Sequence, residues 1–414
     1  MDLKDGKAFW SNINTHKSHF SPLEEDVECD VCIIGTGVSG ANAAYFLAET
    51  GLKVVVVDKR GIGEGSTSAN TGLLQYSNDK TLTSTIQSFG EDIGFRHYQL
   101  CFDAIELLKK SVVPSLDEDP DFIIRKSLYL ASSKKDKPLL DKEFELFKKF
   151  GFPVEYYDQN MIEKKFGFSR PAALVTDNDA EVNPYRLVHS LLQYAHKKGT
   201  RVHPYTRING KKLSQDQSVL YTENGYEIRT KYVIFSTGYE AQEEKRDPNA
   251  IIVSSYAIAT NSLSESDMWY ERMMIWETDR PYIYARTTRD HRIIMGGLDE
   301  KTSFVEKRES MLLHKRDLLL DMIGNYFPNV VGKIEAEFYW GAFYGETHDG
   351  LPTIGIYEDY PNSYFMLGYG GNGTVYSIIL AQIIRDLITK GKHNDINIYL
   401  KERPSSKGSV LSHE

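Results

Sequence analysis

The sequence predicts an α/β fold with two domains, one built on a parallel sheet and a second α+β domain built on an antiparallel sheet. Three observations predict it. A continuous apolar run meets a glycine-rich turn within residues 31–40, a second apolar run covers residues 53–58, and alternating strand patterns fill residues 251–300. Central parallel strands are apolar on both faces, whereas antiparallel strands with one solvated face alternate.

The composition is that of a globular protein and excludes several functions. The chain has 414 residues, 41% of them apolar and 26% charged, which allows two or more packed regions. Its net charge of -9 argues against nucleic-acid binding, which normally uses a basic face. No segment has the apolar length of a membrane helix, and the polar N-terminus does not resemble a secretory signal. We expect a cytoplasmic protein without a membrane span; the sequence does not indicate its oligomeric state.

Two cysteines, Cys29 and Cys32, have the spacing of a redox or zinc pair. At the start of a regular strand these two positions point to opposite faces of the sheet. No second Cys or His pair lies nearby. We therefore expect structural cysteines and no metal site.

The first apolar run begins a dinucleotide-binding unit of the Rossmann type. Gly35-x-Gly37-x-x-Gly40 follows the strand at once, and residues 38–50 have the pattern of a helix that ends before a glycine. The first glycine permits the tight turn, the second lets backbone N–H groups approach a pyrophosphate, and the third lets helix and strand pack. The next strand ends in Asp58, at the spacing of a carboxylate that accepts from a ribose.

The segment after Asp58 favours FAD over NAD. An NAD domain normally passes from its second strand through a short loop into a helix. Here residues 59–74 are rich in Gly, Ser, Thr and Asn, so that many hydroxyls and backbone N–H groups could follow a pyrophosphate toward a flavin.

Three blocks of the chain resemble the D-amino-acid oxidase/glycine oxidase superfamily of FAD-dependent oxidoreductases, which includes γ-glutamylputrescine oxidases. The first is IIGTGVSGANAAYFLAETGLKVVVVDKRGIGEGSTSANTG and the second is KYVIFSTGYE. The third combines YWGAFYGETHDGLPTIG with NSYFMLGYGGNGTVYSIILAQIIRDLI, where a glycine-rich loop presents a second helix N-terminus. The resemblance implies an FAD-binding domain of the GR2 type and a separate substrate domain.

The blocks set the expected domain boundaries and the expected cofactor contacts. The domains are an N-terminal arm at 1–27, a discontinuous FAD-binding domain at 28–80, 170–250 and 340–395, a substrate domain at 81–169 and 251–339, and a tail at 396–414. The residues expected to hold FAD are Gly35, Gly37, Val38, Ser39, Gly40, Asp58, Lys59, Ser66, Thr67, Ser68, Ala69, Asn70, Thr71, Gly72, Leu73, Ile208, Thr237, Gly238, Gly345, Gly370, Gly371, Asn372, Gly373 and Thr374.

The remaining elements are predicted from the spacing of their apolar residues and from the residues that mark their ends. The arm has no regular pattern, whereas amphipathic helices are indicated at residues 95–110 and 139–150 and a charged helix at residues 305–330. Another helix is indicated within residues 181–200. The elements between them are a strand at 201–208, a hairpin that turns at 223–225, and a helix at 375–388.

Aromatic side chains are the main candidates for the substrate site. Tyr282 and Tyr284 share one strand face, and the resemblance places Tyr282 at a substrate-binding position, although a half-buried sheet tyrosine is the alternative. Arg286 has the same parity, but an outer-face salt bridge is favoured for it. The other substrate candidates are Gln75, Tyr76 and Tyr344, and the catalytic candidates are Tyr282, His348 and Glu346, with a turn histidine as the alternative for His348.

Two departures from the family refine the expected chemistry. Its amino-acid oxidases place an arginine shortly after a Trp-Gly pair, but no arginine follows Trp340-Gly341 in this stretch. Its covalent members hold FAD through a cysteine near the same place, and no cysteine follows Cys101, so we expect noncovalent FAD.

The expected reaction is oxidation of a C–N bond in an amine or amino acid. The resemblance implies hydride transfer to flavin N5, hydrolysis of the imine, and reoxidation by oxygen or another electron acceptor. The alternatives are an FAD-dependent dehydrogenase of a hydroxy acid or polyol phosphate, a flavin-binding protein without turnover, and an NAD dehydrogenase.

Overall fold

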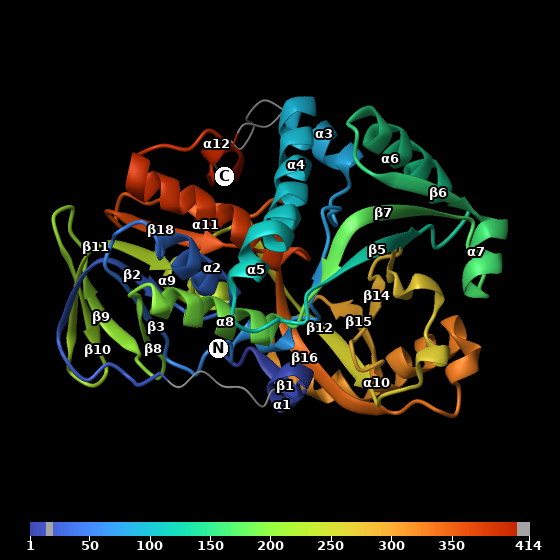
Figure 1. The fold of residues 1–414 in the computed structure, drawn as a ribbon, viewed down its shortest axis with the longest axis horizontal. Coiled ribbons are helices and arrows are strands. Elements are labelled where there is room, and N and C mark those ends of the chain that lie inside the picture. The colour runs from blue at the N-terminus through green and yellow to red at the C-terminus, as the bar shows by residue number, and fades with distance from the viewer. Residues whose placement is uncertain (14–19, 404–414) are drawn as a thin grey trace.

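Two β-sheets with helices packed on them make up the structure, a computed structural model (Figure 1). It describes residues 1–13 and 20–403. Parts of the expected arm and tail, residues 14–19 and 404–414, lie outside the described residues.

The smaller sheet confirms the Rossmann-like prediction. Its centre is parallel, from β18 through β11, β2 and β3 to β8, while β17 is antiparallel to β18. A hairpin of β9 and β10 extends from β11. Its strands, in sheet order, are β17 (Thr353–Gly355), β18 (Ser363–Leu367), β11 (Glu227–Phe235), β2 (Val27–Ile34), β3 (Val54–Val57) and β8 (Arg201–His203), joined by β10 (Ser218–Thr222) and β9 (Ile208–Lys212).

Helices cover one face of this sheet. Within the apolar core of that face, α2 (Val38–Leu47) packs between α8 (Pro184–Lys197) and α11 (Gly373–Lys390). The opposite face packs against side chains of the hairpin region, in a separate cluster that includes Val55 and Leu220. The sheet is buried on both faces, as its apolar strands predict.

An irregularity near the start of β2 corrects one expectation about the cysteines. The N–H groups of Asp30 and Val31 both donate to the carbonyl of Lys53, at 2.9 and 3.1 Å. The strict alternation of side chains is lost at this point, and Cys29 and Cys32 lie in the same apolar cluster instead of on opposite faces. Both thiols are free, and burial raises the pKa of Cys29 to about 11. They remain apolar core residues, not a reactive thiolate pair.

The larger sheet confirms the predicted antiparallel sheet of the second domain. Among the described residues its pairings are antiparallel except that between β13 and β5. In sheet order the strands are β1 (Lys4–Lys7), β16 (Ala336–Thr347), β12 (Ala250–Thr260), β15 (Ile293–Glu300), β14 (Ile283–Thr287), β13 (Met274–Glu277), β5 (Ile123–Leu130), β7 (Ala172–Glu181) and β4 (Leu73–Leu74), with β6 (Val154–Asp158) paired to β7.

The remaining helices lie around the two sheets. A long helix, α10 (Val305–Tyr326), packs on β12 and β16, and α4 runs beside α11 near the centre of the molecule (Figure 1). The other helices are α1 (Phe9–Ile13), α3 (Leu82–Phe89), α4 (Glu91–Leu107), α5 (Val113–Ser115), α6 (Lys137–Lys149), α7 (Gln159–Phe166), α9 (Ala241–Glu244) and α12 (Ile396–Tyr399).

Long-range strand pairing differs from the expected boundaries in four places. The N-terminal arm is not wholly irregular, because β1 pairs with β16 and Asp5 accepts from the N–H of Gly341 and from Arg308, each at 3.0 Å. The strands β4, β7 and β16 belong to the larger sheet, although residues 28–80, 170–250 and 340–395 were assigned to the FAD-binding domain. We keep the two-domain division as a proposal, with these strands on the substrate side.

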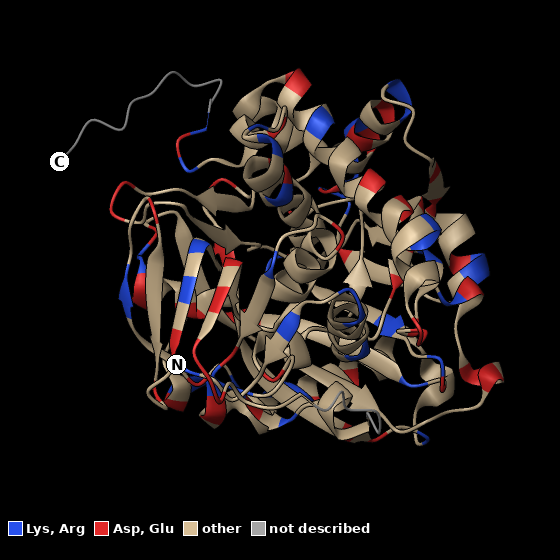
Figure 2. Ribbon diagram, turned by 60° about the vertical axis from the view of Figure 1, so that its left-hand side comes forward, with Lys and Arg blue, Asp and Glu red and all other residues tan. Residues whose placement is uncertain are grey.

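Charged residues of both signs are spread over helices, strands and loops (Figure 2). None of the helices in the described part of the chain has the length and apolar character needed to cross a membrane.

Candidate active site

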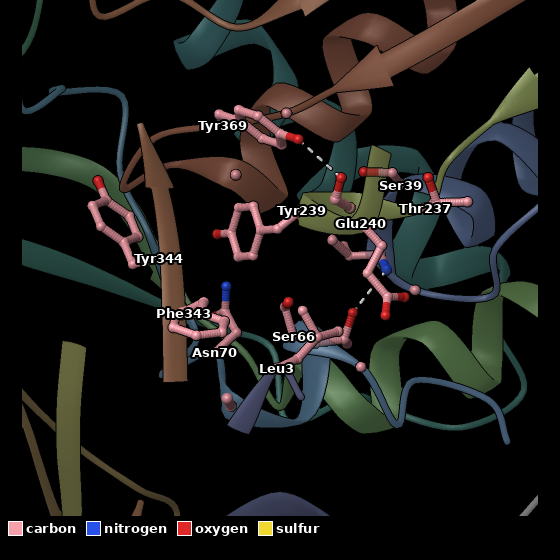
Figure 3. Close-up of a pocket in the computed structure, with 18 of the residues that line it drawn as sticks. Leu3, Ser39, Ser66, Asn70, Thr237, Tyr239, Glu240, Phe343, Tyr344 and Tyr369 are labelled. Carbon is pink, nitrogen blue, oxygen red and sulfur yellow. Dashed lines mark hydrogen bonds between the residues drawn. The ribbon is translucent and has the colours of Figure 1, made fainter. Parts of the chain in front are cut away.

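A cavity of about 530 Å³ lies where the ends of the smaller sheet meet the larger sheet. Its wall combines segments that are distant in the sequence, from the first glycine turn to the glycine loop before α11. The side chains labelled in Figure 3 surround it: Leu3, Ser39, Ser66, Asn70, Thr237, Tyr239, Glu240, Phe343, Tyr344 and Tyr369.

Most residues expected to hold FAD line this cavity. Those that do not are Gly40, Ser68, Gly72, Gly345 and Thr374. The residues that do are Gly35, Gly37, Val38, Ser39, Asp58, Lys59, Ser66, Thr67, Ala69, Asn70, Thr71, Leu73, Ile208, Thr237, Gly238, Gly370, Gly371, Asn372 and Gly373.

The glycine turn between β2 and α2 has the geometry that its spacing predicts. Gly35 has a φ of +118°, where a side chain would be strained, and a Cβ there would overlap the carbonyl of Ser236. A Cβ on Gly40 would overlap the carbonyl of Gly35, so the third glycine serves helix–strand packing rather than the cavity wall. At the first turn of α2 the N–H of Val38 donates to the hydroxyl of Thr67, at 3.0 Å.

Asp58 lies at the end of β3 and fixes the same turn. Its carboxylate accepts from the N–H and hydroxyl of Thr36, at 2.7 and 2.9 Å, and from the N–H of Arg60, at 2.9 Å. Burial raises the pKa of Asp58, and these hydrogen bonds oppose the rise. Because a carboxylate offers about four acceptor sites, it can still accept from a ribose hydroxyl.

An ion-pair network, which the sequence did not reveal, stands at this end of the cavity. Glu240 binds Arg60 at 2.8 Å and Lys59 at 3.0 Å. Burial by itself would raise the pKa of Glu240, but the hydrogen bonds from Arg60 and Lys59 lower it to about 2. We call Lys59, Arg60 and Glu240 the ion-pair end; Ile208, expected beside adenine, also lines the cavity.

Unsatisfied hydroxyls along the wall fit a bound phosphate-rich cofactor. The side-chain oxygens of Ser66 and Thr237 are buried, line the cavity and have no hydrogen-bond partner. Buried polar atoms without partners are uncommon in folded proteins. Together with the two glycine-lined helix N-termini, they fit FAD, and these residues would hold it.

The second helix N-terminus is tied to the first. The hydroxyls of Ser39 on α2 and Ser377 on α11 lie 2.9 Å apart. Asn372 donates to the carbonyl of Ser77 at 2.7 Å and so holds the glycine loop against the segment after β4. Thr374, the second residue of α11, is buried and does not line the cavity.

The segment after the expected flavin loop alternates strictly between cavity and core. Leu73, Gln75, Ser77 and Asp79 line the cavity, whereas the residues between them are buried behind it. The expectation for Gln75 therefore fits this geometry, but that for Tyr76 is corrected. The hydroxyl of Tyr76 donates to the carbonyl of Pro153, at 2.8 Å, within an aromatic core cluster. Extended chains place successive side chains on opposite sides, which separates these neighbours.

Arg286 holds the flavin loop from behind and is not an outer-face residue. Its side chain is only 2% exposed. One guanidinium nitrogen donates to the carbonyls of Thr71, Gly72 and Val182, at 3.3, 2.7 and 2.8 Å. Glu181 lies 3.8 Å away and is fully buried. Gly72 gives this cluster room, because a Cβ there would overlap the carbonyl of Val182.

The tyrosines expected at the substrate site form the other end of the cavity. Tyr282 and Tyr284 share one face of the chain, with ring centroids 5.9 Å apart, and both line the cavity. Tyr344 lines it too and donates to Asp79 at 3.1 Å. We call Tyr282, Tyr284 and Tyr344 the tyrosine end.

The remaining candidates on β16 and in its following turn do not line the cavity. Glu346 is half-buried behind the wall, and burial and the nearby Asp79 raise its pKa. His348 is exposed. Gly345 makes room for the ring of Tyr239 and accepts from the N–H of Gly370 at 2.8 Å, so it positions the glycine loop. The structure therefore does not bring Glu346 and His348 into the cavity wall, and this geometry gives their expected catalytic roles no support.

Two carboxylates at the tyrosine end were missed by the sequence analysis. Asp79 and Asp299 both line the cavity, and Trp276 lies beside them in the wall. The alternation after residue 73 could have indicated Asp79. No local pattern indicates Asp299, which lies within a bulge in β15.

None of the three cysteines lines the cavity, which fits noncovalent FAD. Cys29, Cys32 and Cys101 are all buried elsewhere in the core. We expect acid precipitation of the yellow protein to leave all of the flavin absorbance in the supernatant. Flavin that stays with the washed pellet would contradict this prediction.

Comparisons with known proteins agree with this geometry. A family model described as "FAD dependent oxidoreductase" matches residues 30–387. A putative Rieske iron-sulfur protein of Bacillus subtilis is 23% identical over 96% of this chain and 75% of that protein. Gamma-glutamylputrescine oxidoreductase of Escherichia coli is 24% identical over 89% and 85% of the two chains. The crystal structure of glycine oxidase from Geobacillus kaustophilus superposes with a TM-score of 0.74 at 18% identity, over 89% and 96%.

Proposed function

Because the chain belongs to the family of FAD-dependent oxidoreductases, we propose that it oxidises a C–N bond of an amine or amino acid. FAD, when bound, accepts the hydride lost from the carbon next to the nitrogen. The nitrogen loses one proton, and water converts the resulting imine to a carbonyl compound and a free amine or ammonia. The names of the two oxidoreductases among the comparisons, which act on amines or glycine, support this proposal.

The observation that carries the proposal is the aromatic wall of the tyrosine end. The nitrogen must be neutral when the C–H bond breaks, and an alkylamine has a pKa of roughly 10 in water, as lysine does. Aromatic surroundings disfavour the charged form of a nitrogen, and the rings of Tyr282, Tyr284 and Tyr344 provide such surroundings. The same rings exclude water and orient the substrate carbon.

An anaerobic reduction screen tests the proposal. We expect at least one amine, N-methyl amino acid or D-amino acid to bleach the flavin absorbance at about 450 nm, because the two electrons stay on the cofactor when oxygen is absent. Dithionite is the control that shows the flavin to be reducible. Bleaching by hydroxy acids or polyol phosphates alone would favour C–OH oxidation, and bleaching by dithionite alone would favour a binding protein without turnover.

The same preparation shows whether oxygen is the electron acceptor. The flavin reduced by substrate is mixed with air-saturated buffer, and the rate at which its colour returns is measured. Rapid return with peroxide formation indicates an oxidase, whereas slow return indicates a dehydrogenase with another acceptor.

A further inference from the structure

The basic residues in the cavity wall lie at one of its two ends, where Asp58, Glu240, Glu243 and Glu244 also line it. The basic residues that line it, Lys59, Arg60, Arg207 and Lys211, come from the ion-pair end and the adjoining β9 region. The tyrosine end instead presents Asp79 and Asp299, and within the described chain no Lys or Arg lines that end. A carboxylate on the substrate would be repelled there, and a cation would be attracted.

A bulge in β15 places Asp299 in the cavity wall. Between Ser254 and Tyr256, β15 has one more residue than β12, and Gly297 and Leu298 both have positive φ, at 125° and 55°. Bulges beside active sites redirect side chains out of the regular alternation. Leu298 therefore has a left-handed backbone conformation, which is uncommon for a bulky side chain.

One oxygen of Asp299, Oδ1, is buried and has no hydrogen-bond partner. Burial raises the pKa of this carboxyl to about 6, against the opposing hydrogen bond of Ser255. An unpaired buried acceptor is costly to the fold. Asp299 therefore lines the cavity with a carboxylate of which one oxygen is left unsatisfied by the protein.

The neighbouring charges compensate Asp299 only in part. The charge of Lys315 lowers the pKa of Asp299, but Lys315 binds Glu300 at 2.5 Å and the carbonyl of Leu298 at 3.0 Å. Asp79 and Glu346 add negative charge on the same side. Arg280, whose guanidinium lies 4.7 Å from the ring centre of Tyr282, partly offsets the charges of Asp79 and Glu346.

Aromatic faces complete a site suited to a cation. The rings of Trp276, Tyr282, Tyr284 and Tyr344 line the same end as the two carboxylates. Aromatic faces attract ammonium and guanidinium groups, most strongly where water is excluded. Rings and carboxylates together are the chemistry that recognises a positively charged nitrogen.

We propose that Asp299, assisted by Asp79, binds a positively charged nitrogen of the substrate that is not the one oxidised. This inference rests on the proposed amine oxidation and names its substrate class: amines with a second cationic group, such as diamines or guanidino-amines. A carboxylate stabilises the charged form of a nitrogen beside it, whereas oxidation needs the neutral form. Both requirements are satisfied when one nitrogen, which is charged, binds the carboxylate and a different nitrogen, which is neutral, is oxidised.

The first experiment measures binding without turnover. The flavin-loaded protein is titrated with tetramethylammonium and with pivalate, which is similar in shape and opposite in charge, at constant ionic strength. Perturbation of the flavin spectrum reports binding, and we expect tetramethylammonium to bind at least about 10-fold more tightly. Equal or tighter binding of pivalate, or no binding of either ion, would overturn the inference.

The variant Asp299→Asn tests the residue itself. We expect its affinity for tetramethylammonium to fall about 10-fold or more, because a charged acceptor becomes neutral, while pivalate binding does not weaken. In the unmodified protein, affinity for the cation should fall as the pH drops through about 6, where Asp299 gains its proton. Asp119→Asn, on an exposed carboxylate, is the matched control and should bind both ions as the unmodified protein does. Unchanged cation affinity in Asp299→Asn refutes the assignment.

Reduction rates separate this inference from the proposed function. Diaminobutane, butylamine and γ-aminobutanoate differ only at the end remote from the reacting amine. We expect diaminobutane to bleach the flavin at least about 10-fold faster than butylamine, and γ-aminobutanoate to be slowest. If butylamine matches diaminobutane, the inference fails and amine oxidation stands. If none bleaches the flavin, the proposed function loses support and the tetramethylammonium titration alone decides the inference.

Discussion

Replacing Arg286 by leucine is expected to destabilise the protein by about 3–5 kcal/mol, the usual cost of breaking a buried ion pair by removing one partner. The arginine donates to three carbonyls of the flavin loop and its neighbour, and Glu181 beside it is 0% exposed. Leucine fills part of the space but satisfies none of these acceptors. We expect a lower urea midpoint, followed by tryptophan fluorescence, and a lower flavin content.

Two further variants show whether the ion pair is the cause. Arg289→Leu removes an arginine that is 55% exposed and pairs with Asp119, so it should cost less than about 1 kcal/mol. The double variant Arg286→Leu, Glu181→Gln should recover part of the loss, because the buried side chain beside the replaced arginine is then neutral; only part is recovered, since Arg125 loses its own ion pair with Glu181, at 3.0 Å. Equal losses in Arg286→Leu and Arg289→Leu would contradict the assigned role.

The parts of the site that were predicted correctly rest on local chemistry. The positive φ of Gly35 and the close approach of Gly40 are demands that a glycine alone satisfies, so their spacing already indicates the turn. Tyr282 and Tyr284 lie on one face because strand alternation is local as well. Such features can be recognised in a sequence without knowledge of distant contacts.

The parts that were missed depend on distant segments. The strand β1 is short and polar, and only its partner β16 makes it a strand. Arg286 was assigned to an outer face because parity cannot show that the loop after Thr71 packs over it. Asp299 reaches the cavity through a bulge, which breaks the alternation on which such predictions depend.

The second large effect is expected at the glycine turn, where Gly37 and Gly40 separate cofactor binding from folding. Gly40→Ala places a methyl group against the carbonyl of Gly35, and overpacking between two backbone segments typically costs about 1–3 kcal/mol. Because α2 must move, we expect this variant to lose both stability and flavin. Gly37→Ala meets only the hydroxyl of Thr67, at 3.1 Å, so it should fold nearly normally.

Gly37→Ala should nevertheless lose flavin, since its methyl group stands where the backbone approaches the pyrophosphate. The control is Gly324→Ala within α10, where the added Cβ meets only the side chain of Val331, at 3.2 Å. Val331 is exposed and free to move, so this variant should retain flavin and stability. Flavin-to-protein absorbance ratios and urea midpoints of the three variants measure both effects. Full flavin content in Gly37→Ala would mean that the cofactor phosphates do not approach this turn, and the helix N-terminus would then need another role.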